Sequence, residues 1–143
     1  MSDYTPDFHP QKTLFQVGVK AIIKHLPSQQ ILILTRSEKV TNTNSTDLPG
    51  GNLENFESPL EGIAREILEE TGLSCTNYKI VHLTTVNHHQ QPLLIIGYTC
   101  ETDSNQVTLD WENSAFAWLT QAEALNLDLP ASHKDIIQKA FSP

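Results

Sequence analysis

The sequence predicts an α/β fold, because strand-like segments stand on both sides of one strongly marked helix and a second helix follows near the end. Residues 59–71 have the apolar spacing of a helix with one buried face. Runs rich in valine, isoleucine and leucine precede and follow that helix. The length of 143 residues suits one domain with a sizeable core. We therefore expect one folded domain over residues 14–143, after a flexible segment at residues 1–13.

Strands are expected on both sides of the marked helix. Two precede it, separated by a turn at Pro27-Ser28, two follow it, and two shorter candidates come later. Their ranges are 17–23, 31–35, 79–86, 92–100, 107–109 and 116–119. Residues 37–48, rich in threonine, asparagine and serine, are expected to be a loop that leads into a glycine turn.

Two further helices are expected in the last part of the chain. A short one covers residues 121–125, and a C-terminal helix begins at Ser132. Ser132 and Asp135 have the spacing of a helix cap. One face of this helix carries the apolar residues Ile136, Ile137 and Ala140.

The helix at residues 59–71 has recognisable ends. Ser58 and Glu61 have the spacing of a capping box, Pro59 falls at the first helical position, and Gly72 is a natural terminator. At about 100° per residue, the apolar side chains span about 140° of the helix surface. We expect this face to pack in the core; it consists of Leu60, Ile63, Ala64, Ile67 and Leu68.

The opposite side of this helix carries Glu66, Glu69 and Glu70 within about 100°. Carboxylates this close repel one another, and a divalent cation between them would remove the repulsion. The alternative is an ordinary solvated acidic face, which is common. Gly62 lies on the same side and either leaves room for a cation or phosphate or is a tolerated surface glycine.

Arg65 stands four residues before Glu69, the spacing of an ion pair on a helix, and Glu57 is another possible partner. A bidentate arginine would hold a carboxylate in position for chemistry. An ordinary surface ion pair is the alternative. Upstream, the pair Gly50-Gly51 permits a tight turn and a close approach of backbone to a ligand.

Residues 51–73 resemble the Nudix box, the signature of the Nudix hydrolase family. The pattern is G-x5-E-x7-R-E-U-x-E-E-x-G-U, where U is aliphatic. Every specified position is filled, by Gly51, Glu57, Arg65, Glu66, Ile67, Glu69, Glu70, Gly72 and Leu73. The chain is therefore identified as a small, MutT-like member of that family.

The resemblance implies an α/β/α sandwich of the α+β type, with a mixed sheet and a loop–helix–loop that binds Mg²⁺ or Mn²⁺. It implies that Glu66, Glu69 and Glu70 are metal-binding carboxylates, with the Gly50 carbonyl as a further ligand. Arg65 is expected to act in catalysis by orienting these acids, and Gly51 to contact the substrate. Glu57 and Gly72 are expected to be structural supports.

Three residues outside the box are further candidates for the site. Glu112 lies six residues before Trp118, and in several Nudix enzymes a glutamate in this loop approaches the metal, as ligand or base. An exposed loop glutamate is the alternative. Trp111 is a candidate for stacking on a substrate base, and His133 lies where MutT-like chains place part of the base pocket. A metal role for His82, His88 and His89 is disfavoured, because they lack ligand spacing on one scaffold.

The composition limits the range of partners. A net charge of −8 argues against a nucleic-acid groove, and the longest apolar run is too short to span a membrane. Two cysteines give neither a disulfide framework nor a metal motif. With no signal peptide visible at the start, we expect a cytoplasmic protein, monomeric or homodimeric. An anionic protein that binds an anionic substrate needs local cations, which again favours a metal site.

The resemblance implies hydrolysis of a pyrophosphate linkage in a nucleotide-type small molecule. Candidate substrates are nucleoside triphosphates, including oxidised ones, ADP-ribose-like derivatives and dinucleoside polyphosphates. The alternative is a catalytically silent nucleotide-binding or regulatory module that retains the fold.

Overall fold

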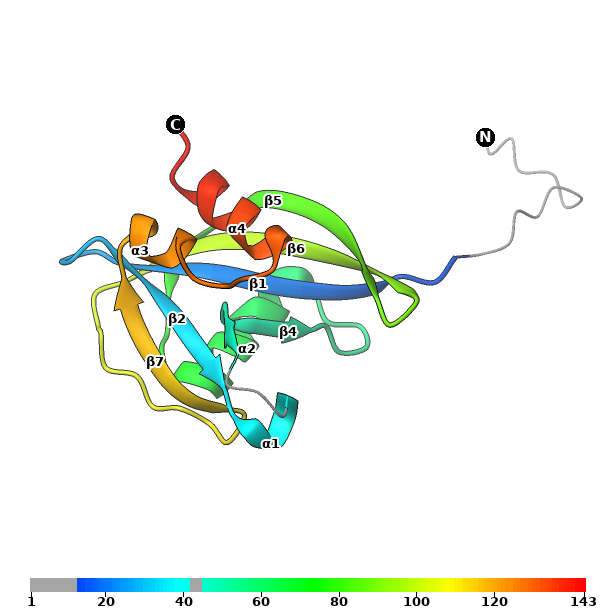
Figure 1. The fold of residues 1–143 in the computed structure, drawn as a ribbon, viewed down its shortest axis with the longest axis horizontal. Helices are drawn as coiled ribbons and strands as arrows, with labels where there is room; N and C mark the ends of the chain where they lie inside the picture. The colour runs from blue at the N-terminus through cyan, green and yellow to red at the C-terminus, as the bar shows by residue number, and fades with distance from the viewer. Residues whose placement is uncertain (1–12, 42–44) are drawn as a thin grey trace, which may run out of the picture.

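The computed structural model describes residues 13–41 and 45–143. It has one sheet with helices on both of its faces (Figure 1). The helices are α1 (Glu38–Thr41), α2 (Pro59–Thr71), α3 (Gln121–Leu125) and α4 (Ala131–Ala140). The strands are β1 (Gln16–His25), β2 (Gln30–Arg36), β3 (Thr46–Asp47), β4 (Gly50–Asn52), β5 (Thr76–His88), β6 (Gln91–Thr102) and β7 (Asn113–Leu119).

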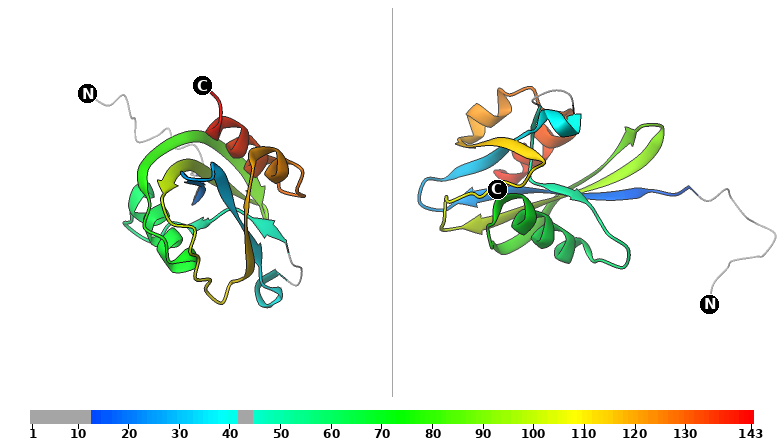
Figure 2. Two further views of the ribbon diagram at one scale, coloured as in Figure 1. Left: turned by 90° about the vertical axis from the view of Figure 1, so that its left-hand side faces the viewer. Right: turned by 90° about the horizontal axis from the view of Figure 1, so that it is seen from below.

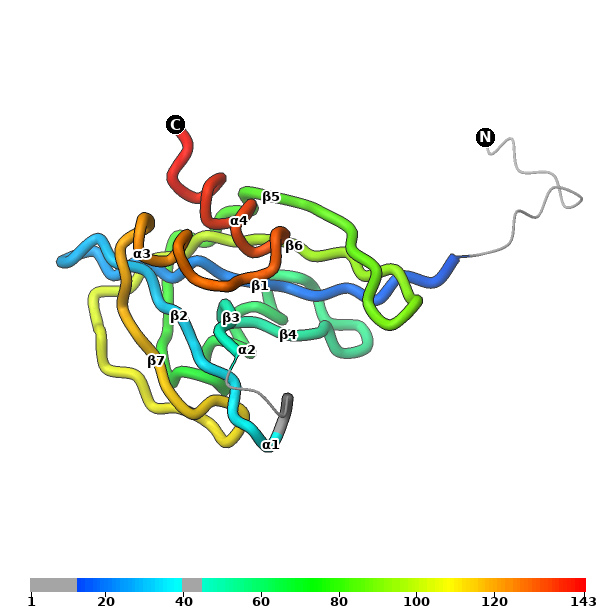
Figure 3. Tube along the Cα trace, in the orientation of Figure 1, coloured from blue at the N-terminus to red at the C-terminus, as the bar shows by residue number. Residues whose placement is uncertain are grey.

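The strands of the described residues form a mixed seven-stranded sheet in the order β3-β2-β1-β6-β5, with β4 paired to β1 and β7 to β2. β1 runs parallel to β6 along its whole length, whereas β5 and β6 form a long antiparallel hairpin. The tube in Figure 3 shows β4 passing beside β1 on the α2 side of the sheet. The expected turn at Gly50-Gly51 is wrong, because both residues belong to strand β4 and pair with β1. The sheet brings this strand next to the acidic helix.

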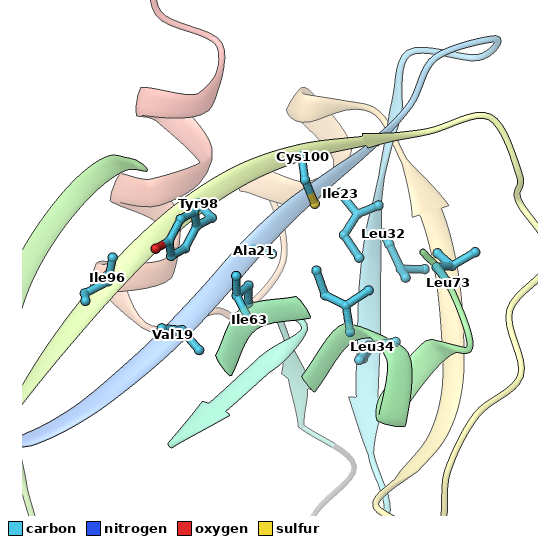
Figure 4. Close-up of a cluster of buried hydrophobic side chains, with 11 residues drawn as sticks. Val19, Ala21, Ile23, Leu32, Leu34, Ile63, Leu73, Ile96, Tyr98 and Cys100 are labelled. Atoms are coloured by element: carbon cyan, nitrogen blue, oxygen red, sulfur yellow. The ribbon is translucent and has the colours of Figure 1, made fainter. Parts of the chain in front are cut away.

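The core between α2 and the sheet forms around Ile63 and Ile67, which are both fully buried. Burying each of these side chains contributes roughly 1.5–3 kcal/mol. They pack against the strand residues shown in Figure 4, namely Val19, Ala21, Ile23, Leu32, Leu34, Ile96, Tyr98 and Cys100. This packing fixes α2 on the sheet and thereby the positions of its carboxylates.

The other face of the sheet is covered by α3 and α4, as the two rotated views in Figure 2 show. Ile136 and Ile137 of α4 are fully buried against this face. A Cβ on Gly97 of β6 would lie 2.8 Å from Ile136 Cγ1, so this glycine allows α4 to approach closely. The two helical layers confirm the expected α/β/α sandwich.

Several predicted element boundaries differ from the structure. Residues 107–109 form no strand, and the expected loop at 37–48 contains α1 and β3. The expected Ser132 cap is wrong, because α4 begins at Ala131 after Pro130 without a side-chain cap. Of the expected flexible segment, residues 1–12 lie outside the described part of the chain. Among the helices that the structure describes, none has the length and apolarity to cross a membrane.

The buried face of α2 is also rotated relative to the prediction. Leu60, Ala64 and Leu68, which were expected in the core, are exposed, whereas Gly62, Glu70 and Thr71 are buried. The helix turns this way because Glu70 forms hydrogen bonds inside the protein, which allows a carboxylate to replace a leucine at the interface. A Cβ on Gly62 would lie 2.3 Å from a methyl group of Leu53, so Gly62 makes room for that side chain and leaves no space for a cation or phosphate.

Candidate active site

The ends of α2 lie where its sequence predicts, although the capping box is only half formed. Ser58 Oγ accepts a hydrogen bond from the Glu61 amide at 3.2 Å, and the Glu61 carboxylate accepts from the Ser58 hydroxyl instead of reaching the backbone. Gly72 closes the helix in the left-handed conformation, with φ of 73°. These ends set the start of the helix and thus the direction in which each glutamate points.

Glu70 is the most firmly held of the three box carboxylates. Its Oε1 accepts from the Gly50 amide at 2.8 Å, and its Oε2 accepts from Asn113 Nδ2 at 3.0 Å. Burial raises the pKa of Glu70 to about 7, although these two hydrogen bonds act to lower it. Glu70 therefore joins α2, β4 and β7 at one buried carboxylate.

Arg65 lies among the other acids of the box. It donates to both Glu57 oxygens, at 2.6 and 3.0 Å, and to Glu66 Oε1 and Glu69 Oε2, at 3.1 and 3.2 Å. The hydrogen bonds to Arg65 lower the pKa of Glu57 to about 2. The predicted ion pair is therefore a bidentate arginine that serves three carboxylates at once, as expected for an orienting residue.

Glu66 lies directly against Gly51 of strand β4. A Cβ on Gly51 would approach its Oε1 to 2.5 Å, so only glycine permits this contact. Burial raises the pKa of Glu66, although the charge of Arg65 opposes this effect. Gly50 has a φ of 145° and lies against Val19, a conformation that side chains rarely adopt.

The donors suit a hard divalent cation, although the side chains face protein partners in this structure. Within residues 13–41 and 45–143, no three carboxylate, imidazole or thiolate groups converge closely enough to enclose a metal ion. Glu66 and Glu69 are instead paired with Arg65. Carboxylate and carbonyl oxygens are nevertheless the ligands that Mg²⁺ prefers, and the Glu69 side chain is half-exposed. The residues present fit the ion.

Glu112 and Trp111 lie in the turn before β7. Glu112 forms an ion pair with Arg36, with 3.6 Å between Oε2 and Nη1. The charge of Glu112 contributes to the raised pKa of Glu66. Trp111 is 69% exposed, while its carbonyl accepts from Ser37 Oγ at 3.1 Å. Glu112 thus acts on one of the box acids, whereas Trp111 is an exposed aromatic side chain.

His133 lies on α4, on the opposite face of the sheet from α2. Its Nε2 is 2.8 Å from Asp47 Oδ1, and its Nδ1 is 3.1 Å from Ser132 Oγ. Lys20 holds the same Asp47 carboxylate at 3.0 Å. Both ring nitrogens of His133 are therefore occupied by protein groups, and the structure does not bring it into the acid cluster.

Asn113 is the residue of this site that the sequence did not single out. Its amide contacts Glu70, which lies 43 positions earlier in the chain. An asparagine at the start of a short strand has no local pattern that announces such a contact. The pairing of β7 with β2 creates the contact by placing the start of β7 beside the end of α2.

Comparison with known proteins identifies one family. The NUDIX domain model matches residues 14–140. A MutT-like protein from Streptomyces ambofaciens is 33% identical over 78 residues, which are 54% of this chain and 49% of that protein. The aligned segment thus spans about half the length of that relative.

Solved structures share the fold. The MutT protein from Methanosarcina mazei Go1 aligns with a TM-score of 0.78 and 28% identity, over 90% of this chain and 94% of that one. The NUDIX domain of Shewanella oneidensis NrtR, in complex with ADP ribose, aligns with a TM-score of 0.76 and 19% identity, over 96% and 92% of the two chains. A Caenorhabditis elegans Ap4A hydrolase aligns with a TM-score of 0.73 and 16% identity, over 87% and 94%.

Proposed function

Because this chain belongs to the NUDIX family, we propose that it is a Mg²⁺- or Mn²⁺-dependent pyrophosphohydrolase. Its substrate is a nucleoside diphosphate or triphosphate derivative, such as a nucleoside triphosphate or a compound of the ADP-ribose type. The observation that carries the proposal is the placement of Glu66 and Glu70 against the two glycines of strand β4. This arrangement puts carboxylate oxygens beside backbone carbonyl oxygens, and both are ligands that Mg²⁺ prefers.

The box residues take distinct roles in this proposal. Glu66, Glu69, Glu70 and the Gly50 carbonyl are the ligands of the cation. A cation bound there neutralises phosphate oxygens and makes the attacking water more acidic. Arg65 and Glu57 orient the ligands, because the bidentate pair anchors the guanidinium that also contacts Glu66 and Glu69.

Hydrolysis forms a bond from the water oxygen to phosphorus and breaks the anhydride bond to the leaving phosphate, which keeps the electron pair. A proton of the water passes to a carboxylate that acts as general base. Glu112 is our candidate for that base, because its charge acts on Glu66 and its side chain is partly exposed.

Substrate recognition is assigned to residues beside the acids. Gly51 is assigned to substrate contact on the family pattern, although the space beside its Cα is taken by the Glu66 carboxylate. The exposed ring of Trp111 offers a stacking surface for a base. His133 would contact a substrate only by exchanging its hydrogen bond with Asp47.

The proposal is tested with a panel of nucleoside triphosphates, NDP-sugars, ADP-ribose and dinucleoside polyphosphates in the presence of Mg²⁺. Released phosphate, pyrophosphate and nucleotide products are measured by chromatography. We expect turnover of at least one substrate, abolished by a chelator. Reaction in H₂¹⁸O identifies the phosphorus that is attacked, from the product that carries the label.

A nucleotide-binding module without turnover is the second candidate function. The complex of the NrtR NUDIX domain with ADP ribose shows this fold holding a nucleotide. The same panel separates the two functions when binding is measured by calorimetry alongside turnover. Tight binding without hydrolysis of any panel member would favour the module and exclude the hydrolase.

A further inference from the structure

Residues 108–113, which form the end of the loop before β7 and the first residue of that strand, are tied to the C-terminal half of α2 at two points. The Thr108 amide donates to the Thr71 carbonyl at 2.9 Å, and Asn113 Nδ2 donates to Glu70 Oε2 at 3.0 Å. Residues 108–113 therefore lie beside the end of α2, and the buried side chain of Asn113 contacts the proposed metal site.

A tight turn fixes the direction of the Asn113 amide. Nδ2 also donates to Asp110 Oδ1 at 3.0 Å, and the Asn113 backbone amide donates to the Asp110 carbonyl at 3.4 Å. From the other side, Ser37 anchors the turn by donating its hydroxyl to the Trp111 carbonyl and its amide to the Glu112 carbonyl. Both protons of the Asn113 amide are thus committed to carboxylates.

The oxygen of the same amide is not satisfied. Asn113 Oδ1 is buried and accepts no hydrogen bond from the described residues. An unsatisfied buried acceptor lowers stability. Stability alone therefore explains this asparagine poorly, whereas holding a reactive carboxylate explains it well.

We propose that Asn113 is a positioning residue that, together with the Gly50 amide, holds the Glu70 carboxylate in the orientation in which it binds the divalent cation. This role rests on the proposed function. Each Glu70 oxygen accepts one hydrogen bond from the protein and keeps a second lone pair for a ligand. Donors behind a metal-binding carboxylate fix its rotamer, and their removal typically weakens metal binding by roughly 10- to 100-fold.

The experiment measures Mn²⁺ binding to the metal-free protein by electron paramagnetic resonance, which follows the free ion and needs no substrate. Asn113→Ala is compared with the wild type and with Asn77→Ala. Asn77 is a matched control, because its Nδ2 donates to the Glu101 carboxylate at 2.9 Å on the exposed part of β5. Its φ of 55° makes alanine there mildly destabilising as well. Melting temperatures of all three proteins are recorded.

We expect Asn113→Ala to raise the Mn²⁺ dissociation constant by about tenfold or more, while Asn77→Ala leaves it within about twofold of the wild type. Equal Mn²⁺ affinity in Asn113→Ala and the wild type would overturn the positioning role. An equal loss in Asn77→Ala would overturn it too, since the loss would then follow from general destabilisation. A wild type that binds no Mn²⁺ contradicts the proposed function itself.

Discussion

Arg65 Nε donates to Glu57 Oε2 over 2.6 Å, and its Nη2 donates to the other oxygen of the same carboxylate over 3.0 Å. The two residues lie on different elements, because Glu57 precedes α2 and Arg65 stands in its second turn. The pair fixes the plane of the guanidinium, so its remaining nitrogen meets Glu66 and Glu69. The positions of Glu66 and Glu69 thus depend on an ion pair that lies outside the proposed metal site.

Arg65→Lys should lower kcat/KM by about 10- to 100-fold, because an ammonium group cannot donate in this planar, bidentate manner. Steady-state kinetics at saturating Mg²⁺ provide the measurement. Glu54→Gln is the control, since Glu54 contacts the same guanidinium at 3.6 Å but is 68% exposed. Comparable losses in the two variants would show that only the net charge around Arg65 matters.

Gly51→Ala should reduce kcat by about tenfold or more with little change in the far-ultraviolet circular dichroism spectrum. The new Cβ would lie 2.5 Å from Glu66 Oε1 and would push that carboxylate away from β4. Gly18→Ala on the adjacent strand is the matched control, because its Cβ would meet ordinary contacts at 3.5 Å. Full activity in Gly51→Ala would mean that the close contact of Glu66 with Gly51 is not needed for catalysis.

The stability of the metal-free protein should depend on the ionisation of Glu70. Burial raises its pKa from 4.5 to about 7, so the folded state binds this proton more tightly than the unfolded state. Glu70 therefore makes stability fall as the pH rises from about 4.5 through about 7, by roughly 3 kcal/mol in total.

Thermal melting in chelator between pH 4 and 8 measures this dependence. The Glu70→Gln variant should lack this contribution, so its stability relative to the wild type should improve across that range. Added Mg²⁺ should stabilise the wild type more at pH 8 than at pH 5, because the ion favours the carboxylate form. The same dependence of melting temperature on pH in the wild type and Glu70→Gln would rule out a raised pKa at Glu70.

Trp111→Ala should raise KM for a nucleotide substrate by the equivalent of about 1–3 kcal/mol of lost base stacking, with kcat nearly unchanged. Trp111→Phe should recover most of the affinity, because an aromatic face remains. Inorganic tripolyphosphate serves as a competitor without a base. An equal loss of its affinity in Trp111→Ala would assign Trp111 to the phosphates or to the shape of the turn.

The acidic helix could be predicted from the sequence because its determinants are local. The spacing of Ser58 to Glu61 and the glycine at position 72 define its ends, and the helical period places Arg65 one turn before Glu69. The fixed spacing of the box also predicts that Gly51 lies beside this helix, as it does in the structure, although in strand β4 and not in the expected turn. Local patterns therefore predicted the helix, its ion pair and the family.

Long-range pairing decided what the sequence did not reveal. The contact of Asn113 with Glu70 exists only because β7 pairs with β2. The predicted burial of Leu60 and Leu68 was wrong, because hydrogen bonds from distant residues allow Glu70 to be buried in their place. In the same way, Asp47 on β3 forms a hydrogen bond with His133, and the spacing of residues within α4 could not predict this contact.

The most direct test of the account is the Mg²⁺-dependent kcat/KM of the wild type, Glu69→Gln and Glu70→Gln on the best substrate of the nucleotide panel. We predict a fall of at least about 10²-fold in each variant, because each loses a charged group that we propose as a ligand of the cation. Both proteins should still fold, as judged by their melting transitions. Activity that survives at the wild-type level in both variants would contradict the proposed metal-assisted hydrolysis.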